Sequence, residues 1–189
     1  MNALEIIAVI FCFASVIFTV RKSVFCWYAG ILGSGLYVFI LLNQHFYAGT
    51  FMQLIFVFQC IVGIMNWRHN TSKNDKLIIE SFDGDGLFKF FLLSCVLCVV
   101  VSFFLINFSD DKYPVIDGVA SSLALAANYA LSKRFLQNWF FWIISDFLFV
   151  FLFLIDHMYL SAGLYMCLMG IATYGYFTWL EDYKLQFEK

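Results

Sequence analysis

The chain has 189 residues, of which 63% are hydrophobic, 21% aromatic and only 13% charged. A water-soluble domain has roughly a quarter of its residues charged, so this composition excludes a soluble globule. The formal net charge of −2, with no basic arm in the sequence, excludes a nucleic-acid-binding protein. Apolar runs of about 18 or more residues indicate membrane helices, and these runs lack the alternation of β-barrel strands. The composition therefore predicts an all-α integral membrane protein.

Turn residues and charges divide the chain into seven predicted helices, each about long enough to cross the hydrocarbon core. They cover residues 3–20, 24–42, 48–67, 87–107, 115–131, 138–155 and 159–180. The first begins with Glu5 rather than a basic segment and lacks a small-x-small cleavage site, so it is interpreted as a mature span and not a signal peptide. The longest hydrophilic stretch is 68–86, and its DGDG segment at 83–86 is typical of a turn before the fourth helix.

The basic residues predict the orientation. Seven helices sort the loops onto two sides, and of the 11 Lys and Arg residues only Lys112 falls on one of them. The other side holds Arg21, Lys22, Arg68, Lys73, Lys76, Lys89, Lys133, Arg134, Lys184 and Lys189. By the positive-inside rule that richer side is cytoplasmic, so the N-terminus is expected outside and the C-terminus inside.

The sequence matches itself at a shift of 112 residues, without a gap, across three helices. The matched pairs include Glu5 with Asp117, Arg21-Lys22 with Lys133-Arg134, Trp27 with Trp139, His45 with His157, Gly63 with Gly175, and Trp67 with Trp179. Because the shift spans four helices, the two bundles would run in the same direction, which is a transporter pattern with the substrate between the halves. The expected division is a first bundle at 1–67, a cytoplasmic loop and linker helix at 68–112, and a second bundle with the C-terminal tail at 113–189.

The segment from Asn138 to Asp146, which reads NWFFWIISD, puts a carboxylate near the middle of a predicted membrane helix. A charge there costs roughly 2.5–3.5 kcal/mol on insertion scales, so an intramembrane Asp is interpreted as functional. Helical spacing places Trp139 and Trp142 on the same face as Asp146. Two indoles beside a carboxylate suit a flat organic cation, through cation–π attraction and charge neutralisation. The alternative is an Asp bonded to a neighbouring helix, with Trp139 in an interfacial belt.

The matching positions of the first half are smaller. Asp146 matches Ser34, and Trp142 matches Gly30, which we expect to leave room for an asymmetric ligand. The complete set of candidate substrate-binding residues is Asn138, Trp139, Trp142, Asp146, Ser34, Tyr37, Gln53, Gln59, Asn128 and Tyr174. For the side-chain amides of Gln53, Gln59 and Asn128, the alternative interpretation is hydrogen bonding between helices, or contact with water for Gln53. Trp67 and Trp179, near the cytoplasmic ends, are interpreted as interfacial belt residues.

No cofactor, metal site or enzyme activity is predicted. The six cysteines are scattered through apolar runs, and Cys95-x-x-Cys98 has metal-ligand spacing without a second pair or a nearby His. No His lies within a predicted span, and no two carboxylates pair at mid-membrane, so a general base or metal cluster for hydrolysis is missing from the sequence.

The repeat, the NWFFWIISD segment, CWYAG at 26–30 and GIMNW at 63–67 together resemble the PnuC family of bacterial vitamin transporters. The resemblance covers nearly the whole chain. It implies a seven-helix 3+1+3 fold, related to the SWEET sugar transporters, in the bacterial inner membrane. Family members carry nicotinamide riboside, thiamine (the PnuT type) or riboflavin by facilitated diffusion, and a cytosolic kinase traps the vitamin. Trimers occur in the family, so the resemblance implies a homo-oligomer, here a homotrimer.

The resemblance also bears on the vitamin. Family members for nicotinamide riboside tend to have Asn at the position of Asp146 and near Cys60 and Tyr174, and this sequence departs at all three. Thiamine is a permanent cation with an aminopyrimidine edge that a carboxylate could bind, and Tyr and Trp could stack on its rings. Thiamine is therefore the favoured substrate, with nicotinamide riboside or riboflavin as the alternatives.

Overall fold

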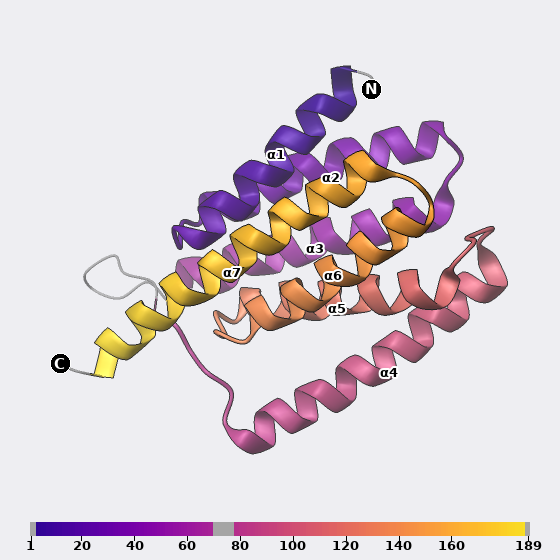
Figure 1. Cartoon of the computed structure of the whole chain (residues 1–189). Coiled ribbons are helices and arrows are strands. Elements are labelled where there is room, and N and C mark those ends of the chain that lie inside the picture. Colours follow the sequence, from indigo (N-terminus) through magenta and orange to yellow (C-terminus); the bar gives the residue numbers. More distant parts are fainter. Residues whose placement is uncertain (1–2, 70–77, 188–189) are drawn as a thin grey trace. The chain divides into compact units, whose positions relative to one another are not determined.

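The computed structural model describes residues 3–69 and 78–187, which fold into seven α-helices (Figure 1). These are α1 (Ala3–Val20), α2 (Phe25–Asn43), α3 (Tyr47–His69), α4 (Gly84–Phe108), α5 (Pro114–Ser132), α6 (Asn138–Ile155) and α7 (Tyr159–Phe187). All seven are long and apolar enough to cross a membrane. Among the described residues no strand occurs, apart from one isolated bridge between Glu80 and Phe135. The predicted all-helical membrane fold is confirmed.

Two helix ends differ from the predicted spans by more than two residues. Helix α4 begins at Gly84 because the Asp83 side chain caps it, accepting a hydrogen bond from the Gly86 amide at 2.8 Å. Only Asp83 of the DGDG segment therefore precedes the helix, and Asp85 lies in the first turn, where a negative charge complements the helix dipole. Helix α7 continues to Phe187, because residues 181–187 contain neither Gly nor Pro to end it.

The helices divide into two compact units, α1–α3 and α4–α7. In the first unit α2 packs against both α1 and α3. In the second unit α6 packs against both α5 and α7, and α4 packs along α5 (Figure 1). The helix between the two predicted bundles thus shares a unit with α5–α7.

Four of the turns that follow helices place a residue with a side chain at positive φ. These residues are Lys22 (φ 56°), His45 (φ 58°), Arg134 (φ 65°) and His157 (φ 58°). After α6, the His157 amide donates to the Leu154 carbonyl and the Met158 amide donates to the Phe153 carbonyl, which is the hydrogen-bond pattern of a Schellman motif. The other three turns have the same pattern. Each turn reverses the chain tightly at the cost of a left-handed backbone, about 1–2 kcal/mol for a residue with a Cβ.

We expect His157→Gly to unfold at a higher temperature than His157→Ala, by the equivalent of about 1 kcal/mol, because glycine adopts positive φ without a Cβ penalty. Both substitutions remove the 3.1 Å hydrogen bond between His157 Nδ1 and the Tyr159 hydroxyl, so their difference isolates the backbone term. Thermal unfolding in detergent, followed by tryptophan fluorescence, measures it. Equal transition temperatures would show that the turn stores no such strain.

Each unit contains one edge-on tryptophan pair that lies against a glycine of a neighbouring helix. The pairs are Trp27 with Trp67, at a centroid distance of 5.4 Å, and Trp139 with Trp179, at 5.5 Å, both with an interplanar angle of 87°. The indoles of Trp27 and Trp139 lie so close to Gly63 and Gly175 that a Cβ on either glycine would approach ring carbons to about 2.4–2.5 Å. All four indoles are at most 2% exposed. The prediction that Trp67 and Trp179 are belt residues is therefore wrong, because each closes a buried pair.

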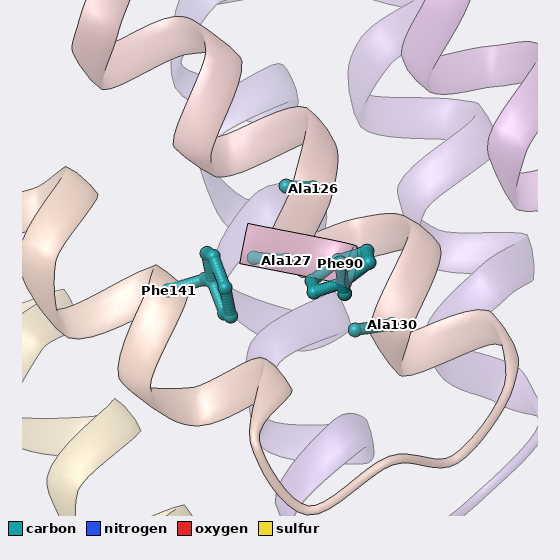
Figure 2. Packing of buried hydrophobic residues seen from close by; sticks show 5 residues of the cluster. All are labelled: Phe90, Ala126, Ala127, Ala130 and Phe141. Carbon is teal, nitrogen blue, oxygen red and sulfur yellow. The ribbon is translucent and has the colours of Figure 1, made fainter. Parts of the chain in front are cut away.

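A second buried cluster lies in the second unit, where α4 and α6 meet α5 (Figure 2). It consists of Phe90, Ala126, Ala127, Ala130 and Phe141. The rings of Phe90 and Phe141 meet edge-on at 5.0 Å, and the small alanines of α5 let both rings approach the helix. Four partly buried side chains pack around this cluster: Phe82, Leu123, Phe135 and Trp142.

Candidate functional site

Asp146 lies halfway along the 18-residue helix α6 and is 5% exposed. Across the described part of the chain, no hydrogen bond or ion pair reaches its carboxylate. The alternative that Asp146 bonds to a neighbouring helix thus finds no support in the described residues. A buried carboxylate without an internal counter-ion is expensive, and a cationic ligand would compensate it.

The two indoles that helical spacing placed on the face of Asp146 have different neighbours. Trp139 packs against Trp179 and Gly175 of α7, whereas Trp142 packs against the cluster that α4 and α5 share with α6. The Trp139 Nε1–H is buried and has no hydrogen-bond acceptor within the described residues. Trp142 is half-buried and so retains part of its surface for other contacts.

Asn138 is fully buried in the first turn of α6. Its Nδ2 donates to the Phe135 carbonyl at 2.7 Å, which ties the side chain to the α5–α6 turn. Its Oδ1 accepts no hydrogen bond from the residues that the structure describes. The start of α6 therefore holds one buried acceptor and one buried donor, on Asn138 and Trp139, without a hydrogen-bond partner among the described residues.

The remaining candidates differ in burial. In the first unit Ser34, Tyr37, Gln53 and Gln59 are half-buried, on α2 and α3. In the second unit Asn128 is buried on α5, which packs against α6, whereas Tyr174 is 66% exposed on α7. Of the other candidates in the second unit, Asn138, Trp139 and Trp142 share helix α6 with the buried Asp146 carboxylate, and Tyr174 lies on the surface.

The space beside Gly30 is occupied. A Cβ on this residue would lie 2.8 Å from Cys60 Sγ and 3.4 Å from Ser15 Oγ, so side chains from α3 and α1 fill the room that we expected the glycine to leave. At the matching positions the second unit has Trp142, Ala172 and Ala127. The small and large residues are exchanged, and sequence comparison at the single position 30 could not reveal this because it ignores the opposing helices.

The titratable residues do not form a metal centre in the described ranges. No group of three or more His, Cys, Asp or Glu side chains there is close enough to hold a metal ion. Cys26 and Cys60 are buried in the first unit, and Cys95 and Cys98 lie on α4.

Comparison with known proteins gives a family and a fold. A family model described as nicotinamide mononucleotide transporter matches residues 2–181. Among solved structures, the crystal structure of the vitamin B3 transporter PnuC is similar, with a TM-score of 0.79 and 18% sequence identity over 96% of this chain and 82% of that chain. At this identity the likeness shows the fold. No curated protein matches this chain.

Proposed function

This chain belongs to the nicotinamide mononucleotide transporter family, and we propose that the vitamin it transports is thiamine. The family is one of multi-pass membrane transporters for small vitamin-type substrates, and it is not an enzyme family. The finer proposal is that this chain admits thiamine by facilitated diffusion across the bacterial inner membrane. Phosphorylation by a cytosolic kinase would then trap the vitamin and keep its inward gradient.

The observation that carries the proposal is the uncompensated carboxylate of Asp146. A carboxylate buried at mid-helix, with no partner among the described residues, is costly. A permanently cationic substrate offsets that cost, because the ion pair forms where water competes weakly. The positive thiazolium ring of thiamine cannot lose its charge by deprotonation. Its aminopyrimidine can also donate a hydrogen bond to a carboxylate oxygen, which adds orientation to the charge attraction.

The same carboxylate discriminates among related vitamins. Nicotinamide mononucleotide carries a phosphate of about −1.5 to −2 charge, which Asp146 would repel. Nicotinamide riboside lacks that phosphate and has a cationic pyridinium ring, so it is the second candidate. The family description and the similar vitamin B3 transporter favour it. Riboflavin is neutral and gains least from the carboxylate.

The proposal includes a 3+1+3 architecture in which α1–α3 and α5–α7 are parallel repeats. Three kinds of local geometry support it at the shift of 112 residues: the positive-φ turns, the edge-on tryptophan pairs and the His–Tyr hydrogen bonds at 3.3 and 3.1 Å. Basic residues of the α1–α2 and α5–α6 turns support a cytoplasmic location for those turns and an external N-terminus.

Binding to the purified protein tests the substrate. Isothermal titration with thiamine, nicotinamide riboside, nicotinamide mononucleotide and riboflavin, each under the same buffer conditions, is expected to give thiamine at least a tenfold lower Kd than the others. Tighter binding of nicotinamide riboside would replace thiamine by the second candidate. Tight binding of the mononucleotide would overturn the role given to the carboxylate.

A further inference from the structure

The segment before α4 forms a strap, residues 79–82, along the turn between α5 and α6. The Glu80 amide donates to the Arg134 carbonyl at 3.0 Å, and the Leu136 amide donates to the Glu80 carbonyl at 2.8 Å. These two bonds make the isolated parallel bridge between Glu80 and Phe135. The backbone of the strap is thereby fixed to the turn between α5 and α6 before α4 begins.

Side chains reinforce the strap. The Arg134 guanidinium, whose side chain is 8% exposed, forms an ion pair with the Glu80 carboxylate, which is 46% exposed. Phe82 stacks on Phe135 at a centroid distance of 3.8 Å. Arg134 also has the positive φ described above, so the turn holds a strained residue whose side chain is used to bind the strap.

Two glutamines extend the attachment to α6 and α7. The Gln137 side chain accepts from the Phe82 amide at 3.2 Å and donates to Ser81 Oγ at 2.8 Å. The Ile79 amide donates to Gln186 Oε1 of α7, also at 3.2 Å. The strap therefore contacts the turn between α5 and α6 and the last turn of α7.

Along its length α4 approaches α5 closely. A Cβ on Gly118 would lie 2.6 Å from the Ser102 Cα, so the two backbones meet where the glycine has no side chain. Ser122 Oγ lies 3.2 Å from the Leu97 carbonyl and hydrogen-bonds to it. The Ser122 side chain also lies close to the Cys98 thiol. These contacts leave α4 little freedom to slide along α5.

At the opposite end a second ion pair attaches the loop after α4 to the end of α6. Lys112 Nζ donates to Asp156 Oδ1 at 2.7 Å, and this hydrogen bond raises the pKa of Lys112. The loop is ordered by Asp111, whose Oδ1 accepts from the Tyr113 amide at 3.0 Å. The two ion pairs, Glu80–Arg134 and Lys112–Asp156, lie at the two ends of α4 and are called the end fasteners below.

We propose that α4 is an integral part of one moving body, α4–α7, and that the end fasteners prevent it from pivoting about α5. Any movement of α5–α7 during transport then carries α4 with it. One fastener alone would leave α4 free to pivot about the attached end. Two attachments, one on either side of the Gly118 contact, fix the angle between α4 and α5. The proposal rests on the transport function only in that a transport cycle supplies the movement.

A disulfide across the α4–α5 interface tests the single body. Ser122→Cys places a new thiol beside the native Cys98. Two copper(II) phenanthroline complexes, each accepting one electron, oxidise the two thiols to a disulfide with release of two protons. We expect the crosslink, counted by maleimide labelling of the thiols left after denaturation, to be complete within minutes. Oxidised protein in proteoliposomes should take up labelled thiamine or nicotinamide riboside within twofold of the dithiothreitol-reduced rate. The Cys98→Ser/Ser122→Cys variant is the control for oxidation elsewhere.

The outcomes separate this proposal from the transport function. Uptake that falls tenfold on oxidation and recovers on reduction would overturn the single body. If the reduced protein transports neither vitamin, the proposed transport function fails. The crosslinking yield then tests the single body by itself: a yield below half overturns it, and complete crosslinking supports it. Adding Glu80→Gln and Asp156→Asn should slow crosslinking at least threefold, whereas the exposed Glu181→Gln should not. An unchanged rate would remove the role of the fasteners.

Discussion

Asp146→Asn is expected to raise the Kd for thiamine at least tenfold, a loss of about 1.4 kcal/mol or more. Asparagine keeps the size of the side chain and one acceptor but removes the charge that we propose pairs with the cation. The folded protein should not suffer, because within the described residues no internal partner of the carboxylate is lost. Its transition temperature should stay equal or rise, since a buried charge costs more than a buried amide. Isothermal titration and thermal unfolding in one detergent measure both quantities.

The exposed Asp110, in the loop after α4, supplies the matched control. Asp110→Asn makes the same chemical change where water already screens the charge, and it should leave both Kd and transition temperature unchanged. Asp146→Glu keeps the charge but displaces it, so we expect an affinity between those of Asp and Asn. Unchanged binding in Asp146→Asn would remove this residue from the substrate site.

Gly175→Ala is expected to destabilise the second unit by about 2–3 kcal/mol. The new Cβ would stand 2.5 Å from Trp139 Cη2, well short of an ordinary van der Waals contact with a side chain that is 1% exposed. An indole cannot bend aside, so the edge-on pair with Trp179 must shift, and overpacking of a filled core typically costs 1–3 kcal/mol. Thermal unfolding monitored by tryptophan fluorescence reports the loss, and the emission of the displaced pair should change with it.

Gly170→Ala, in the same helix, is the control. Apart from the nearby backbone of α7, no heavy atom of the described residues lies within 4 Å of its added Cβ, and replacing a glycine inside a helix gains roughly 0.5–1 kcal/mol. The two substitutions should therefore have opposite signs in one helix. Gly63→Ala should reproduce the loss in the first unit, where the Cβ would meet the Trp27 ring. A stable Gly175→Ala protein would mean that helix separation adjusts freely at this contact.

The helices could be predicted from sequence because a membrane helix satisfies its backbone within its own segment. Hydropathy therefore locates the seven spans without knowledge of neighbouring helices. The observed start of α4 differs from the predicted one because a local capping signal was missed: the Asp83 side chain accepts a hydrogen bond from the Gly86 amide. The unusual carboxylate of Asp146 was also visible, because charge within an apolar run needs no partner to be recognised.

Helical periodicity assigns a face to a residue but does not identify what covers that face. Trp139, Trp142 and Asp146 share a side of α6 by spacing, yet the first indole packs on α7 and the second on the cluster with α4 and α5. Trp67 and Trp179 were expected at an interface on the grounds of position, and their burial follows from the facing Trp27 and Trp139. Gly30 was expected to open space that Cys60 and Ser15 fill.

The sequence by itself thus determined the membrane class, the seven helices, the paired tryptophans and glycines at a fixed shift, and a carboxylate without an obvious reason to be buried. Tertiary structure decided which tryptophan packs against which glycine, and that the Cys60 and Ser15 side chains occupy the space beside Gly30. It also decided that α4 belongs to the unit of α5–α7. The physical reason is that hydropathy and backbone hydrogen bonding are local along the chain. Packing volume and ion pairing depend on residues such as Glu80 and Arg134, which only folding brings together.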